Sequence, residues 1–265
     1  MSTTAKTAPV LPGLIDTHTH LGMEPLGTDI AGVLSRARAH GVEQVITIGT
    51  TRADSEAALA IARAHQGVFA TVGVHPHDSG VHSEIDLTEM RDLCADAKCV
   101  AVGEIGLDYH YDHSPRDVQR YWFRRQLELA REFSLPVVIH TREAEADTQA
   151  ILAEFPDVTG VMHCYSSGPE LAKAALDMGF YLSFSGIITF PKAEEVRQIA
   201  AMAPLERILV ETDCPFLAPV PFRGKPNEPA YVSLVATKLA EIKGITPQAL
   251  AAAATANSRA LFGLK

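Results

Sequence analysis

The stretch Leu14-Ile15-Asp16-Thr17-His18-Thr19-His20 starts as an apolar run and ends in two histidines spaced i, i+2. This pattern predicts a buried β-strand. Alternate residues of a strand point to the same side, so His18 and His20 are directed at one point from the C-terminal end of the strand. Histidine is a preferred ligand of zinc and related metals. A lone His-x-His could also be two structural histidines, so the prediction of a metal site depends on the rest of the chain.

Seven further apolar, β-branched segments follow, and a helical segment comes after each strand. We predict these strands over residues 42–49, 68–74, 99–105, 136–140, 158–163, 180–185 and 207–213. Alternating strands and helices give a parallel sheet. Eight units in about 250 residues fit a closed α/β (β/α)8 TIM barrel. An open doubly wound sheet usually carries a Gly-rich phosphate loop after its first strand, where this chain has histidines.

The predicted architecture is one catalytic barrel domain over residues 13–265, preceded by a disordered N-terminal segment over residues 1–12. Helix signals support the pattern between the strands. Thr28-Asp29 is typical of a helix start, and Ser114 is expected to cap a helix that has Pro115 at its first position. Two further helical segments are predicted after the last strand, over residues 231–243 and 247–261.

Composition excludes several classes of protein. The 265-residue chain is 47% hydrophobic and 21% charged, as is typical of a globular protein with a large core. Its net charge of −9 and its lack of a Lys/Arg-rich block argue against a broad basic face for duplex DNA. The four cysteines form no C-x-x-C pair and are expected to be reduced thiols. We expect a cytoplasmic protein without a signal peptide or membrane span.

Polar residues end most of the predicted strands. They are His18, His20, His75, His77, Glu104, His140, His163 and Asp213. In such barrels the C-terminal strand ends surround one mouth, where the chemistry takes place. Each residue taken singly could be a hydrogen-bonded strand end. Together they would crowd into one cavity, and imidazole and acidic groups that share a cavity are stabilised by a cation.

We therefore predict two divalent metal ions at this mouth. Three ligands come from strands one and eight, which touch when the barrel closes: His18, His20 and Asp213. Two come from the neighbouring strands five and six: His140 and His163. Glu104 would bridge the ions with its two oxygens, and Asp213 would also accept the proton of the attacking water, so these two are the predicted catalytic residues. Four imidazoles suit Zn, Mn, Fe or Co better than Mg.

Seven motifs resemble those of the TatD family of metal-dependent deoxyribonucleases. They are DTHTH (16–20), GVHPH (73–77), GEIGLDY (103–109), VVIHTREA (137–144), MHCYSS (162–167), YLSFSGIITF (181–190) and ILVETDCPFLAPVPFRGKPNEP (208–229). The resemblance covers residues 14–262, and the motifs follow the predicted strands in order. It implies an amidohydrolase-type barrel, two divalent cations, commonly taken as Mg, and hydrolysis of DNA. The metal-ligand pattern of the family falls on the same six residues as the two-ion prediction.

Substrate contacts are expected from four residues near the predicted mouth: Arg142, His75, Arg223 and Tyr109. Arg142 could form charge-assisted bonds to a phosphate. Arg223 lies with Lys225 in the Pro-rich loop after the last strand. His75 or its neighbour His77 could bond a phosphate oxygen. Each of these residues could also be an ordinary surface or structural residue.

The predicted function is phosphodiester hydrolysis of DNA by a metal-activated water. A recessed mouth with few positive charges favours single-stranded ends over duplex, and the resemblance implies the 3′–5′ direction. We expect DNA as the partner, no membrane, and a monomer. Three alternatives stay open: hydrolysis of aminoacyl-tRNA esters, a small-molecule amidohydrolase, and a non-catalytic binding protein. Many amidohydrolases bridge their metals with a carbamylated lysine on strand four, whereas here that strand ends in Glu104 and Lys98 lies at its other end.

Overall fold

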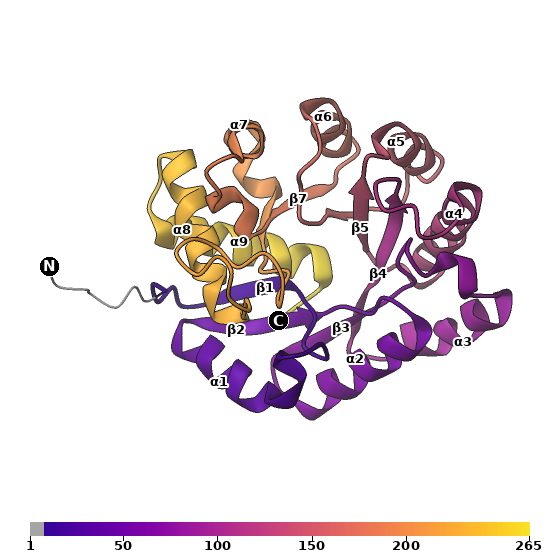
Figure 1. The fold of residues 1–265 in the computed structure, drawn as a ribbon, viewed down its shortest axis with the longest axis horizontal. Helices are drawn as coiled ribbons and strands as arrows, with labels where there is room; N and C mark the ends of the chain where they lie inside the picture. The colour runs from indigo at the N-terminus through magenta and orange to yellow at the C-terminus, as the bar shows by residue number, and fades with distance from the viewer. Residues whose placement is uncertain (1–7) are drawn as a thin grey trace, which may run out of the picture.

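Eight parallel strands form a barrel in the computed structural model, which describes residues 8–265. Each strand pairs with the next one along the chain. The strands are β1 Leu14–Thr19, β2 Val42–Thr47, β3 Val68–Val72, β4 Cys99–Asp108, β5 Val137–Arg142, β6 Gly160–Met162, β7 Tyr181–Phe184 and β8 Ile208–Val210. The predicted (β/α)8 barrel is thereby confirmed, and Figure 1 shows the helices arranged around the strands.

Helices connect the strands and follow the last of them. The α-helices of the described residues are α1 Ile30–Ala39, α2 Arg52–Ala64, α3 Glu84–Cys94, α4 Arg116–Phe133, α5 Glu145–Ala153, α6 Pro169–Asp177, α7 Glu194–Met202, α8 Val232–Lys243 and α9 Pro247–Phe262. Short 3-10 helices add η1 Leu26–Thr28, η2 Ser79–Val81, η3 Gly186–Thr189, η4 Leu205–Arg207 and η5 Pro229–Tyr231. No helix within residues 8–265 is both long and apolar enough to cross a membrane.

The barrel closes between β1 and the residues that follow β8. The backbone N–H of Asp213 donates to the carbonyl of His18 at 2.9 Å, and the N–H of His20 donates to the carbonyl of Cys214 at 2.8 Å. These bonds continue the parallel pairing beyond the end of β8, where Thr19 also bridges Cys214. The first and last strands are thus joined at the level of the predicted metal ligands.

A buried carboxylate reinforces this closure. Asp16 accepts hydrogen bonds from the backbone N–H of Thr212 at 2.9 Å and from its Oγ1 at 2.6 Å, although the two residues are 196 positions apart. Burial raises the pKa of Asp16 well above its usual value, and the bonds from Thr212 oppose that rise. Because buried polar groups need partners, the contact fixes β1 relative to the segment after β8.

The start of the chain departs in part from the predicted disordered segment 1–12. Residues 1–7 lie outside the part that the structure describes. Leu11, however, is only 2% exposed, and its N–H donates to the carbonyl of His40 at 3.1 Å. The packed domain therefore begins before residue 13, because Leu11 adds an apolar side chain to the main core.

Helix α4 does not begin as predicted. Its N-cap is Pro115, and Ser114 lies one residue outside the helix. The Ser114 hydroxyl donates to the carbonyl of His77 at 2.7 Å and accepts from the N–H of Gly80 at 2.9 Å. The Ser114 hydroxyl therefore holds the loop after β3 in place and does not cap α4. Asp29, in contrast, caps α1 as expected by accepting a bond from the N–H of Gly32 at 3.0 Å.

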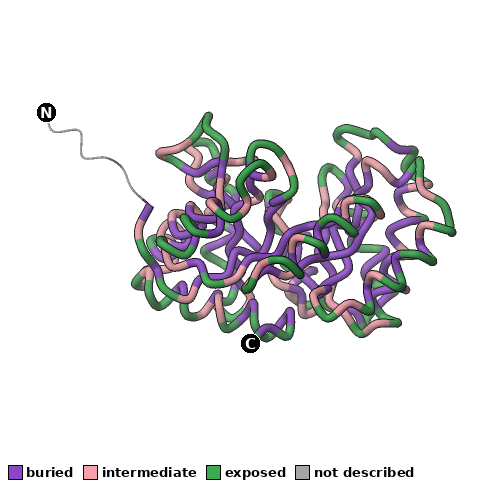
Figure 2. Tube along the Cα trace, turned by 90° about the horizontal axis from the view of Figure 1, so that it is seen from below, coloured by how far each residue is buried: buried purple, intermediate pink, exposed green. Residues whose placement is uncertain are grey.

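Two apolar clusters hold the fold together. The larger lies between the strands and the helices. The smaller fills the barrel interior with buried residues from six strands and includes Leu261 and Phe262 of α9, and the partly buried Phe69 of β3 and Tyr181 of β7 pack against it. Helix α9 contacts both β1 and β8 and covers the N-terminal end of the barrel. Figure 2 shows the buried strands surrounded by partly exposed helices. The opposite, C-terminal end is left for the polar residues.

Candidate metal centre

His18 and His20 point into the mouth from the end of β1. The alternating side chains of Thr17 and Thr19 face the neighbouring strands instead, since Thr17 Oγ1 donates to the carbonyl of Val210 at 3.0 Å and Thr19 Oγ1 to that of Ile46 at 2.8 Å. This alternation is the period of two expected of a strand. It leaves both imidazoles on the side of the cavity, as the i, i+2 spacing predicted.

Glu104 of β4 lies between two groups of histidines. Its Oε1 is 2.8 Å from Nε2 of His163 and 3.0 Å from Nδ1 of His140. Its Oε2 is 3.5 Å from Nε2 of His18. Burial would raise the pKa of Glu104, but the charge of His163 and the hydrogen bonds from His140 and His163 hold that pKa well below its usual value. One oxygen of the ionised carboxylate therefore faces the imidazoles of His140 and His163, and the other faces that of His18.

Asp213 completes the group on the β1 side. Its Oδ1 lies 3.4 Å from Nε2 of His20 and 3.6 Å from Nε2 of His18. Burial would raise the pKa of this carboxyl, but the hydrogen bond from His20 and the charge of His163 lower it. The six residues predicted as ligands are thus gathered in one place by the fold.

Unpartnered nitrogens show that the site suits a cation. Both ring nitrogens of His18 and Nδ1 of His20 are buried and make no hydrogen bond among residues 8–265. Burial and the nearby charge of His163 lower the pKa of His18, and the two rings stack with centroids 3.9 Å apart. Buried polar atoms normally have partners, and a neutral imidazole nitrogen offers its lone pair to a metal. The donor set therefore fits divalent cations.

Three sets of donor atoms are close enough together to hold an ion. They are His18, His20 and Glu104; His75, Glu104 and His140; and His18, His163 and Glu211. The first set belongs to the ion predicted at strands one and eight. Glu104 and His18 each belong to two sets, so the donors form one continuous centre.

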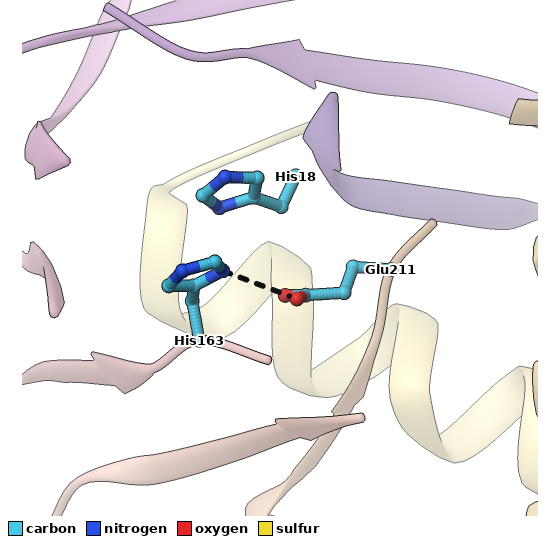
Figure 3. A group of neighbouring side chains, drawn as sticks. All are labelled: His18, His163 and Glu211. Atoms are coloured by element: carbon cyan, nitrogen blue, oxygen red, sulfur yellow. Dashed lines mark hydrogen bonds and ion pairs between the residues drawn. The ribbon is translucent and has the colours of Figure 1, made fainter. Parts of the chain in front are cut away.

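Glu211 was not predicted from the sequence. It is buried just after β8, where its Oε1 accepts from the backbone N–H of Cys164 at 2.8 Å and lies 3.2 Å from Nδ1 of His163 (Figure 3). The other ring nitrogen of His163 faces Glu104. A carboxylate behind a ligating histidine fixes the ring and its tautomer. The sequence does carry a signal for Glu211, because it is a charged residue within an apolar strand and lies on the same side of that strand as Asp213.

Asp108 has the same role behind His140. Its Oδ2 lies 3.0 Å from Nε2 of His140 and 2.9 Å from Nε2 of His77. Its Oδ1 accepts from the backbone N–H groups of His110 at 3.1 Å and Tyr111 at 2.8 Å. Burial would raise the pKa of Asp108, but the bond from His140 and the loop bond from Tyr111 lower it. One carboxylate thus joins a ligand histidine to the loop after β4.

His75 is a neutral donor beside Glu104. Its Nδ1 accepts a bond from the N–H of His77 at 3.1 Å, so the ring proton lies on Nε2, which is 3.5 Å from Glu104 Oε1. Burial lowers the pKa of His75 to about 4, which keeps the ring neutral at pH 7. The proton on Nε2 therefore faces Oε1 of Glu104.

Two predicted arginines, one at the end of β5 and one in the loop after β8, have no carboxylate partner within residues 8–265. Arg142 ends β5 and stacks over the ring of Tyr111 at 4.8 Å. Arg223 stacks over the ring of Phe190 at 4.4 Å. Tyr109 is not brought to the centre, because its hydroxyl donates to Asp147 of α5 at 2.5 Å. Since side chains alternate along β4, Tyr109 faces away from the side of Glu104.

A parallel barrel that gathers imidazoles and carboxylates at its C-terminal strand ends, with unpartnered nitrogens among them, defines a metal-dependent hydrolase. Comparison with known proteins agrees. The chain belongs to the TatD-related DNase family, whose model matches residues 15–263.

Similar proteins cover nearly the whole chain. An uncharacterized metal-dependent hydrolase, YabD, of Bacillus subtilis is 43% identical over 94% of this chain and 98% of its own length. The 3′-5′ ssDNA/RNA exonuclease TatD of Cronobacter sakazakii is 35% identical over 87% of this chain and 90% of its own. The crystal structure of the TatD homologue YjjV of Escherichia coli K12 superposes with a TM-score of 0.91 at 32% identity, covering 96% of this chain and 99% of that one.

Proposed function

We propose that this hydrolase is a nuclease that removes nucleotides from the 3′ end of single-stranded DNA with the help of two divalent ions. Six side chains would hold the ions: His18, His20, Glu104, His140, His163 and Asp213. The position of Glu104 carries the proposal, since its Oε1 faces His140 and His163 while its Oε2 faces His18. A C. sakazakii relative bears the name of such an exonuclease.

The ions would supply Lewis acidity, activating water and stabilising charge on the phosphate in the displacement. The donor set favours zinc, manganese, iron or cobalt, and magnesium is the alternative. All six donors come from one chain, so a monomer suffices for the site.

Asp213 is the proposed proton acceptor. Its lowered pKa keeps the carboxylate ionised at neutral pH, and its side chain retains 13% exposure at the mouth. Water would attack the phosphorus of the terminal nucleotide while Asp213 takes one of its protons. The bond from phosphorus to the 3′-oxygen of the shortened strand breaks, and that oxygen receives a proton from the protonated Asp213 or from solvent. The neutral His75 would donate its Nε2–H to a phosphoryl oxygen, where negative charge grows.

Arg142 and Arg223 are the proposed phosphate contacts outside the centre. Most arginines on the outer helices are paired with carboxylates, as Arg124 is with Glu154. The two mouth arginines lie on aromatic rings instead, so their guanidinium N–H groups stay available to an anion. With a net charge of −9 and only these local cations, the mouth suits a flexible strand end better than a duplex.

The position of Lys98 argues against a carbamate-type amidohydrolase. Its ammonium group donates to the carbonyl of Val68 at 3.0 Å, at the end of the barrel opposite Glu104. No lysine of β4 therefore reaches the centre.

Digestion of end-labelled linear and circular single strands tests the proposal. We expect stepwise shortening of the linear strand from its 3′ end and an intact circle. Ready cleavage of the circle would show internal attack. If neither strand is cut but aminoacyl-tRNA releases its amino acid, the protein is an ester hydrolase instead.

A further inference from the structure

Phe216 is an exposed aromatic residue on a fixed loop beside the metal centre. Its side chain is 52% exposed, and its ring meets the ring of His20 edge-on at a centroid distance of 5.9 Å. The loop is held by the buried amide of Asn227, whose Nδ2 donates to the carbonyls of Phe216 at 2.7 Å and Thr212 at 2.8 Å. An apolar ring is thus presented to solvent by a backbone that is anchored in the core.

Tyr111 is the second such residue. It is 51% exposed and lies under the guanidinium of Arg142. Its ring meets that of His77 edge-on at 5.4 Å, and its backbone N–H is held by Asp108. Because Asp108 also bonds His140, this ring is fixed relative to the metal centre as Phe216 is.

The two rings lie on opposite sides of the mouth. Tyr111 follows β4 and Phe216 follows β8, and these strands are four places apart in a closed barrel of eight. The metal centre extends between them, from His20 next to Phe216 to His140 next to Asp108.

We propose that Phe216 and Tyr111 stack on the two nucleobases that flank the scissile phosphate of a single-stranded nucleic acid. The inference rests on the proposed nuclease function. A strand that crosses the mouth places its phosphate over the centre and one base on each side. Aromatic rings bind bases with little regard to sequence, because every base has a flat π-face.

Combining protein variants with substrate changes tests the stacking. The substrates are oligodeoxynucleotides with an abasic spacer at the terminal or the penultimate 3′ position, compared with the intact strand. We expect Phe216→Ala to lower kcat/KM about 10- to 100-fold on the intact strand. On the strand that lacks its base partner, the variant should match the wild type. Tyr111→Ala should show the same pattern at the other of the two 3′ positions: a lower kcat/KM on the intact strand, and no difference from the wild type on the strand that lacks that base.

Controls separate stacking from damage to the metal centre. Phe216→Trp should restore the rate, and Tyr121→Ala should leave it unchanged, because Tyr121 is 49% exposed but bonds Glu84 on the outer helices. In EDTA, 2-aminopurine at the coupled position should be quenched by wild type and less by Phe216→Ala. Equal losses on intact and abasic strands, or no loss, would overturn the stacking alone. A wild type that cuts neither strand would overturn the nuclease function with it.

Discussion

The carboxylate of Asp108 lies 3.0 Å from Nε2 of His140, on the side of the ring away from Glu104. The ring is therefore held between two carboxylates, because its Nδ1 lies 3.0 Å from Oε1 of Glu104. Glu211 does the same for His163 from the opposite part of the barrel. The orientation of two proposed ligands, His140 and His163, thus depends on carboxylates that need touch neither ion nor substrate.

Asp108→Asn is expected to weaken metal binding about 10- to 100-fold, because the ring loses the acceptor that sets its tautomer. Glu211→Gln should have a similar effect through His163. Titration with a competing chelator measures the affinity directly. Asp112→Asn is the matched control, since Asp112 is exposed in the same loop and pairs with Arg116. Unchanged affinity in both buried variants would contradict the orienting role.

Glu104→Ala is expected to remove both ions and nearly all activity, because one carboxylate is proposed to contact both. Elemental analysis of the purified variant would count the ions. Lys98→Ala should leave the metal content and the rate of hydrolysis close to those of the wild type, since this lysine lies at the far end of β4. If Lys98→Ala is the damaging change, the carbamate-type site is restored as the better description.

Asp213→Asn is expected to fold and to lower kcat about 10²- to 10⁴-fold, the usual loss for a general base. The amide oxygen of the variant can still face a cation, but it cannot accept the proton of the attacking water. The pH profile of kcat measured beside the wild type checks the assignment. A variant with normal turnover and an unaltered profile would remove Asp213 from the base role.

Metal removal is expected to abolish activity and to lower the melting temperature. Ions that bind only the folded state stabilise it by mass action, and without them unpartnered nitrogens stay buried. Calorimetry before and after chelation, followed by addition of each cation, measures both effects. Full activity in a verified metal-free sample would refute the two-ion proposal.

The gathering of ligands could be predicted because it follows from backbone rules. The i, i+2 spacing of His18 and His20 sets their common direction, and parallel strands bring their C-terminal ends to one mouth. Outcomes that depend on side-chain partners were harder to predict. Ser114 has the composition of a helix cap, yet its hydroxyl is taken by the loop after β3.

The same periodicity contained information that was not used. Counted in steps of two from Glu104, β4 places Asp108 on the side of the centre and Tyr109 on the other side. Counted back two residues from Asp213, the same period of two places Glu211 on the side of the strand that faces the metal centre. What periodicity could not give was the aromatic partner of Arg142, because Tyr111 lies in a loop whose shape depends on bonds to Asp108.

The closure of the barrel has a consequence for the time at which the enzyme becomes active in the cell. Asp16 and Thr212 are 196 residues apart, and the bonds that join β1 to the segment after β8 frame the ligands of one ion. A chain still on the ribosome therefore carries His18 and His20 long before Asp213 is synthesised. Such a nascent chain has no complete site for the proposed ion, and the site can form only after the segment that carries Thr212 and Asp213 has been made.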